Sequence, residues 1–189
     1  MKAFIKENRY LVTNQLLNQF GGAVLGLVLS FLFVMRGNTA VLLSAIFSVG
    51  FYVVLQYTAL WDAGARDIIR VEGRRLKYRP YAGVVMAAFA NIPNFLIAIC
   101  VTVGTVFGRS IENGGAFGYE WAGNLATVSK LIGSVWESMF NGFVQLYSPH
   151  NPIVYWFMPI VSIVAAGLGY FAGMKNFRII PARKNAKKK

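Results

Sequence analysis

Four long apolar runs, at residues 16–35, 40–61, 83–107 and 152–171, constrain the fold of this chain more than any other feature. Each run has about 20 residues or more and contains no Asp, Glu, Lys, Arg or His. A helix rises about 1.5 Å per residue, so each run is long enough to cross the roughly 30 Å hydrocarbon core of a bilayer. The runs predict an all-α polytopic membrane protein with four transmembrane helices, folded as one integral membrane domain over residues 1–189.

The basic residues gather on one side of these predicted spans. The net charge is +12, and sixteen of the 19 Lys and Arg residues fall in segments 1–10, 61–82 and 173–189. Four spans put these three segments on the same side, and an excess of Lys and Arg marks the cytoplasmic side. We therefore expect cytoplasmic N- and C-termini, a basic cytoplasmic tail at 173–189, and a location in the bacterial plasma membrane. In this arrangement the positive charge binds anionic lipid headgroups and no nucleic acid.

Residues 126–147 predict an amphipathic helix between the third and fourth spans. An apolar stripe runs in steps of three and four residues from Val128 to Phe143, with Lys130 and Glu137 on the opposite face. A crossing here would bury Lys130 and Glu137 and export the basic tail, at a cost of a few kcal/mol for each mid-bilayer charge. We therefore expect this helix to lie on the outer membrane surface or to be partly re-entrant.

The most charged stretch of the chain follows the second span, at the predicted cytoplasmic surface. Its candidate functional residues face a protein partner or lipid: Asp62, Arg66, Asp67, Arg70, Arg74 and Arg75. Steps of four residues from Asp62 to Arg74 predict a helix that continues from the span and carries these charges on one side. Two interpretations remain open. The basic residues attract anionic headgroups, at about 1 kcal/mol each, or the stretch is a docking surface or an inner gate made of ion pairs.

Polar residues inside the spans form a second set of candidates. Asn91, Pro93 and Asn94 interrupt the third span, and a proline within a helix predicts a kink. Transporters use such breaks to expose polar groups to a solute, and the structural alternative is that both amides pack against neighbouring helices. A polar collar at the start of the first span either marks the lipid boundary or faces into the bundle: Asn14, Gln15, Asn18 and Gln19.

Small residues recur every four positions on two of the predicted spans. Gly22 and Gly26 lie on the first span, and Ala165, Gly169 and Gly173 follow the same spacing on and just after the fourth. This spacing clears one face of a helix so that another backbone can approach closely. We expect these faces to pack within the bundle or to join a protein partner or a second copy of the chain.

Signatures of catalysis and of metal binding are missing from the sequence. The chain has one cysteine, Cys100, inside the third span, and one histidine, His150, in the predicted outer loop. A Cys–His nucleophile pair needs hydrogen-bond contact, and these two residues are predicted about half a membrane apart. Standard catalytic motifs and phosphate-binding glycine loops do not occur. We expect no enzyme activity, no cofactor and no metal site.

The layout resembles small four-span membrane proteins of Gram-positive bacteria. The resemblance rests on residues 61–67, 73–80, 91–94 and 121–124, and it implies a fold and a location but no activity. The expected function is that of a non-enzymatic accessory, scaffolding or assembly subunit of a membrane complex, because the charge lies in the cytoplasmic segments and none lies mid-span. The alternative is a small oligomeric transporter or channel for a small solute.

Overall fold

The computed structural model describes residues 2–112, 119–147 and 151–177. Within these ranges the chain is helical and has no β-strand, which confirms the predicted all-α class. The long helices are α1 (Lys2–Phe33), α2 (Asn38–Glu72), α4 (Ile92–Glu112), α5 (Glu120–Trp136) and α7 (Ile153–Met174). The short elements are η1 (Val34–Arg36), α3 (Ala82–Ala90), η2 (Ser138–Phe140) and α6 (Asn141–Tyr147). His150 and most of the predicted basic tail lie outside the described residues.

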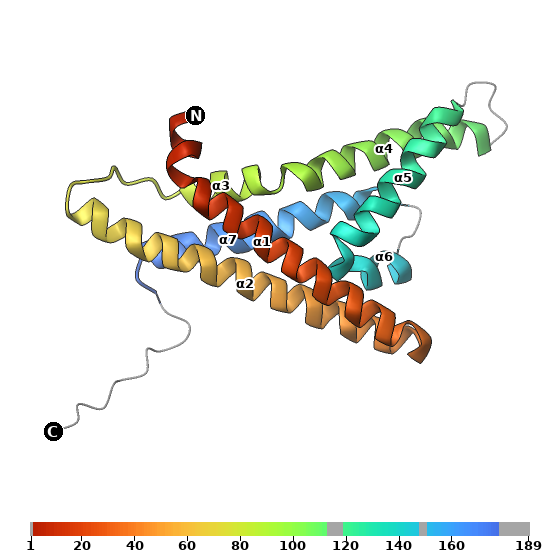
Figure 1. Cartoon of the computed structure of the whole chain (residues 1–189), viewed down its shortest axis with the longest axis horizontal. Coiled ribbons are helices and arrows are strands. Elements are labelled where there is room, and N and C mark those ends of the chain that lie inside the picture. The colour runs from red at the N-terminus through yellow and green to blue at the C-terminus, as the bar shows by residue number, and fades with distance from the viewer. Residues whose placement is uncertain (1, 113–118, 148–150, 178–189) are drawn as a thin grey trace.

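The helices form a bundle with two distinct ends (Figure 1). The N-terminus, the α2–α3 connection and the end of α7 lie at one end, which we call the charged end. The α1–α2 turn, the end of α4 and the start of α5 lie at the opposite end, which we call the far end. Helix α7 packs most extensively along α2 and also contacts α3 and α4, while α1 packs on α2 and α5 on α4. The α1–α2 turn passes through Gly37 at φ +92°, a backbone angle that glycine adopts without strain.

Several helices have the length and composition of membrane spans. Asn8–Arg36, α2 and α7 each pass this criterion. Helices α3 and α4 pass it together but are bent by 55° at their junction, so the described part of the chain has three helices that could cross a membrane, or up to four if the bent pair is one span. Large apolar side chains cover the outside, and Phe31, Phe47 and Leu131 are 83%, 60% and 67% exposed. Such continuous apolar surface is unusual for a water-soluble monomer and is compatible with a membrane location.

Small residues bring α2 and α7 into close backbone contact. A Cβ atom added at Gly169 would lie 3.0 Å from Tyr57 Cα, and one added at Gly64 would lie 3.0 Å from the backbone nitrogen of Met174. Any larger side chain at these positions would push the two helices apart. The small-residue face predicted on the fourth span is therefore used within the bundle.

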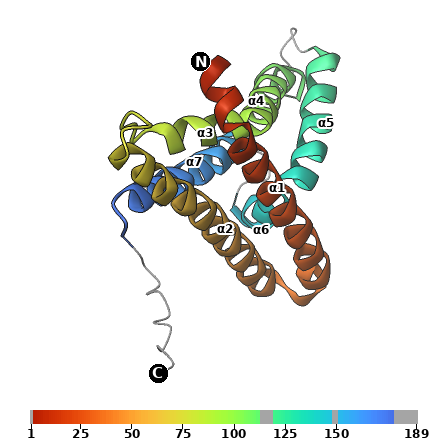
Figure 2. The same ribbon diagram turned by 60° about the vertical axis from the view of Figure 1, so that its left-hand side comes forward.

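The segment between α4 and α7 differs from the predicted continuous helix over 126–147. Its first helix, α5, ends at Trp136, and η2 joins it to the short helix α6. Helix α5 runs back from the far end along α4, while η2 and α6 pack against α1 and α2 (Figures 1 and 2). We call α5, η2 and α6 together the hairpin. The prediction of one unbroken helix is wrong because the chain turns at Glu137, whose φ of −111° and ψ of 26° lie outside the helical range.

The tip of the hairpin, Ser138–Phe140, is buried against the small-residue face of α1. A Cβ atom added at Gly26 would lie 2.6 Å from the carbonyl carbon of Ser138, and one added at Gly22 would lie 3.1 Å from the sulfur of Met139. The Ser138 hydroxyl donates a hydrogen bond to the Ala23 carbonyl. The glycine pair predicted as a packing face therefore receives a segment of the same chain.

Helix α5 turns its large apolar side chains away from the bundle, whereas Glu137, Met139 and Phe140 at the turn are buried. Leu131, Val128 and Val135 are more than half exposed, whereas Glu137 is 1% exposed. The prediction that Glu137 avoids burial is therefore wrong. A helical period tells which residues share a side, but where lipid replaces water the apolar side is stable when it faces outward.

Candidate functional site

Polar side chains from five parts of the bundle meet in its interior. We call these residues the polar core: Gln19, Tyr52, Gln56, Asn91, Asn94, Trp136 and Ser162. All of them except Trp136 are at most 3% exposed. Burying an amide or a hydroxyl is costly unless it is hydrogen-bonded, and here the side chains bond mainly to one another. The result is a connected network that ties together α1, α2, the α3–α4 junction, α5 and α7.

The α3–α4 junction supplies the two amides at the centre of this network. Helix α3 ends at Ala90, and Pro93 lies in the first turn of α4, where a helix needs no backbone N–H from that residue. The predicted break is confirmed, and its bend of 55° lies at Asn91, two residues before the proline. Asn94 Nδ2 donates to Asn91 Oδ1 at 2.9 Å, so the break holds both amides side by side.

Asn94 joins this junction to α1 and to the hairpin. Its Oδ1 accepts hydrogen bonds from Gln19 Nε2 and from the indole Nε1 of Trp136, the second at 2.8 Å. The first contact crosses to α1 and the second crosses to the last residue of α5. One amide oxygen therefore fixes the position of the hairpin relative to the first span.

Asn91 joins the junction to α7 and α2. Its Nδ2 donates to the Ala87 carbonyl at 2.8 Å and to Ser162 Oγ at 2.9 Å. Ser162 Oγ also accepts from the hydroxyl of Tyr52 at 2.8 Å. Gln56 Nε2 in turn donates to the Tyr52 oxygen at 2.9 Å. This chain of hydrogen bonds crosses the bundle from the helix break to the second span.

Several buried polar atoms beside the network have no partner in the part of the chain that the structure describes. They are both carboxyl oxygens of Glu137, both amide heteroatoms of Gln15, and Oε1 of Gln56. Glu137 is adjacent in sequence to Trp136 and lies near the hydroxyls of Tyr52 and Tyr155. Gln56 Nε2 approaches the Gln15 carbonyl at 3.4 Å, which places these two glutamines together. The polar core thus retains unused hydrogen-bonding capacity.

The charged stretch after the second span is helical to Glu72, which confirms the predicted continuation of that span as a helix up to this residue. The prediction that Arg74 shares this helix is wrong, because Arg74 lies beyond its end at φ +54°. Asp62, Arg66, Arg70, Arg74 and Arg75 are exposed at the charged end. Arg66 Nε donates back to the Asp62 carbonyl at 3.2 Å, which is a contact within one helix. These exposed charges lie apart from the polar core.

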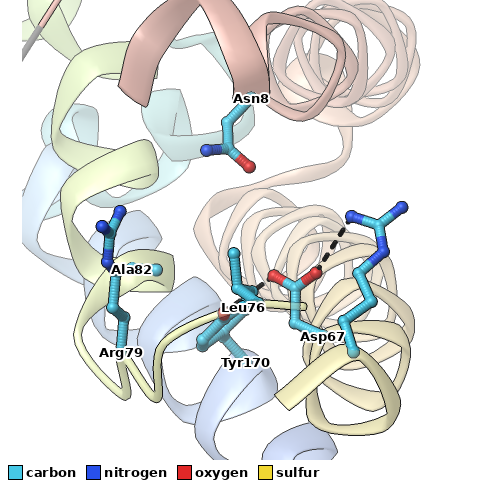
Figure 3. A pocket seen from close by; sticks show the side chains of 7 residues that line it. Asn8, Asp67, Leu76, Arg79, Ala82 and Tyr170 are labelled. Carbon is cyan, nitrogen blue, oxygen red and sulfur yellow. Dashed lines mark hydrogen bonds and ion pairs between the residues drawn. The ribbon is translucent and has the colours of Figure 1, made fainter. Parts of the chain in front are cut away.

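Asp67 is the member of this stretch that faces the bundle. Its Oδ2 accepts a hydrogen bond from the Tyr170 hydroxyl at 2.9 Å, and its Oδ1 lies 3.5 Å from Arg70 Nη1. Both contacts line a small pocket that Asn8 and Arg79 also border, and Figure 3 shows Asn8 pointing into it from α1. Because Arg70 is 62% exposed, the ion pair contributes little, and the tyrosine contact ties α2 to α7.

Sequence reasoning identified Asn91, Asn94 and the glutamines of α1, but it missed the other members of the polar core. Tyr52 and Gln56 lie one helical turn apart in an apolar run, and Ser162 is an isolated hydroxyl in another. Their only distinguishing feature in the sequence is that each is a polar residue within an apolar predicted span. Trp136 and Glu137 carried no such signal, because their segment was expected on the outer membrane surface or partly re-entrant.

No family model, curated protein or solved structure matches this chain. Among the described residues, no group of three or more His, Cys, Asp and Glu side chains is placed to hold a metal ion.

Proposed function

We propose that this chain is a non-enzymatic integral membrane protein that moves a small polar solute through its polar core. In the proposed layout Asn8–Arg36, α2, the bent α3–α4 pair and α7 cross the bilayer, and the hairpin enters from the far end without crossing. The charged end faces the cytoplasm, in agreement with the positive-inside bias. The location in the bacterial plasma membrane is part of the same proposal.

The observation that carries this proposal is the meeting of a broken helix and a hairpin tip around buried hydrogen-bonding groups. Broken helices in transporters offer polar and backbone groups to a ligand near the bilayer centre. Here Asn91 and Asn94 lie at the break, and Trp136 of the hairpin contacts Asn94 at 2.8 Å. Movement of the hairpin relative to α1 and α4 would separate these partners and expose the same atoms to a solute.

The chemistry of the core favours a neutral solute with both donors and acceptors. The network consists of amides, hydroxyls and one indole, and Gln15 and Gln56 keep amide atoms that no described residue satisfies. Amides bind groups of either hydrogen-bonding kind and carry no charge. Small polyols and small amides fit this description.

A second proposal, an accessory or scaffolding subunit, rests on the exposed charges at the charged end. Arg66, Arg70 and Arg74 project where a cytoplasmic partner or a second copy could dock. We rank this proposal second because attraction to anionic headgroups, at about 1 kcal/mol per basic residue, accounts for the same charges.

Solute entry into proteoliposomes tests the first proposal. Glycerol and urea serve as probes, and entry is followed by light scattering after an osmotic step. We expect faster entry than in protein-free vesicles and loss of the increase in the Asn91→Leu, Asn94→Leu double variant. Thr58→Val is the matched control, because the Thr58 hydroxyl bonds back to carbonyls of its own helix and lies on the exposed side.

Absence of solute entry above protein-free vesicles, with a folded protein, would overturn the transport proposal. The accessory proposal predicts instead a stoichiometric partner, crosslinked in native membranes, that is lost when Arg66, Arg70 and Arg74 are replaced by Gln. A loop variant that keeps its partner while the Asn double variant loses flux would count against the accessory role.

A further inference from the structure

Glu137 is an acidic residue buried at the turn of the hairpin, and its environment is unusual. The residue is 1% exposed, and neither carboxyl oxygen has a hydrogen-bond partner among the described residues. A buried carboxylate without a partner costs several kcal/mol, and the neutral acid costs much less. The residue therefore occupies its position most stably with a proton bound.

The groups that face Glu137 do not offset a negative charge. Helix α2 contributes Tyr52 and α7 contributes Tyr155, and both would be neutral hydroxyls beside it. Residues 15–26 of α1 and 92–107 of α4 contain no acidic or basic side chain. On its own element the nearest base is Lys130, two helical turns before it. Burial accordingly raises the pKa of the Glu137 carboxyl, which lies between α5 and η2 and outside the candidate spans.

The position of Glu137 links its charge to the seating of the hairpin. Its neighbour Trp136 donates to Asn94 in the polar core, and its neighbour Ser138 donates to the Ala23 carbonyl of α1. These two hydrogen bonds join the turn to other helices. If Glu137 ionises and moves toward water, both of these hydrogen bonds are pulled apart, because their donors are the residues on either side of it.

We propose that Glu137 is a proton-binding residue whose protonation keeps the hairpin tip seated against α1, so that release of the proton opens the polar core. In this step the O–H bond of the carboxyl breaks, the electron pair stays on the carboxylate, and water accepts the proton. The link to solute movement rests on the proposed transport function, whereas proton binding and the release of the tip do not.

The sign of the pH dependence follows from linkage. The seated hairpin holds the proton more tightly than an exposed glutamate, whose ordinary pKa is about 4.3. The bound proton therefore stabilises the seated hairpin fully when the pH is below the ordinary glutamate pKa. This stabilisation decreases as the pH rises toward the raised pKa of the buried carboxyl. Within this window the open fraction increases about tenfold for each pH unit.

Infrared spectroscopy and hydrogen exchange of the full-length protein in lipid bilayers test the proposal. We expect an absorption band of a neutral carboxylic acid that disappears as the pH is raised and is missing in Glu137→Gln. Hydrogen exchange in residues 134–142 should rise with pH in the wild type relative to Glu137→Gln, which keeps a neutral side chain at every pH. Glu120→Gln is the matched control, because Glu120 is exposed at the start of α5 and its loss should leave both signals unchanged.

The outcomes separate this inference from the proposed function. The inference is overturned if the wild-type spectrum has no neutral-acid band that depends on Glu137. It is also overturned if hydrogen exchange at the tip matches that of the Gln variant at every pH. Either result counts even if solute enters the vesicles. A Glu137-dependent band with pH-dependent tip exchange supports it, even if neither glycerol nor urea enters, in which case the transport proposal fails alone.

Discussion

Replacement of Gly26 by Ala tests whether the hairpin tip is seated on α1 as described. The added Cβ atom would lie 2.5 Å from Met139 Cα and 2.6 Å from the Ser138 carbonyl carbon, whereas ordinary contact begins at 3.4 Å. The backbone nitrogen of Met139 would lie closer still, so the tip must withdraw by more than about 0.9 Å, the difference between 2.5 Å and 3.4 Å. All of these clashing atoms belong to the backbone, so rotation of a side chain gives no relief. Overpacking of this kind costs about 1–3 kcal/mol.

Gly21→Ala is the matched control on the same helix. No described atom outside its own helical neighbourhood lies within 4 Å of a Cβ atom built at Gly21. Alanine is also the better helix former by roughly 0.5–1 kcal/mol, so this variant should be as stable as the wild type or more stable. Unfolding free energies measured in bicelles by steric trapping should place Gly26→Ala below Gly21→Ala by about 1–3 kcal/mol or more. Equal stability of the two variants would refute the proposed seat of the hairpin.

Two further predictions concern the charged end and the orientation. Tyr170→Phe removes the hydrogen bond to Asp67, so the same unfolding assay should register a loss of about 1 kcal/mol; an unchanged value would mean that this contact does not hold α2 and α7 together. With Cys100 replaced by Ala, a cysteine at Thr39 should react with an impermeant thiol reagent in intact cells, whereas one at Arg75 should react only after lysis. The opposite labelling pattern would reverse the proposed orientation.

The helices themselves followed from the sequence because hydrocarbon imposes a simple rule. A chain segment in lipid must satisfy its backbone hydrogen bonds internally, so an apolar run of sufficient length becomes a helix. The break at Asn91 was predictable in the same way, since Pro93 cannot donate a backbone hydrogen bond and favours the first turn of a helix. The spacing of small residues also predicted a packing face around Gly169, but it did not predict that α2 is the element packed there.

The position of the hairpin was not predictable, because helical periodicity shows which residues share a side but not whether that side faces the bundle or faces outward. Val128, Leu131 and Val135 were correctly grouped on one side of a helix, but this side faces outward, and Met139 of the same predicted stripe is buried at the turn. The segment with Glu137 was expected on the outer membrane surface or partly re-entrant, on the argument that a buried charge is costly. The argument holds for the ionised form, while a neutral acid at a helix turn escapes most of that cost.

The polar core was only partly predictable because hydrogen bonds between helices depend on their relative rotation. Asn91 and Asn94 stood out by their position beside a proline. Ser162 and Tyr52 are 110 residues apart in the chain, and nothing in their local sequence states that their hydroxyls meet at 2.8 Å. Such pairings emerge only when α2 and α7 are placed together.

The depth of α5 in a bilayer tests the central claim, that the hairpin enters the membrane and carries its tip to the polar core. Nitroxide labels at Val128 and Val135 suit this measurement, because both side chains are exposed, at 54% and 52%, and lie on the same helix. Seven residues of helix correspond to about 10 Å. If α5 descends steeply, depth measured from the ratio of oxygen to nickel-complex accessibility should increase by most of this distance from Val128 to Val135. Equal depths at the two positions would place α5 along the membrane surface and contradict the account.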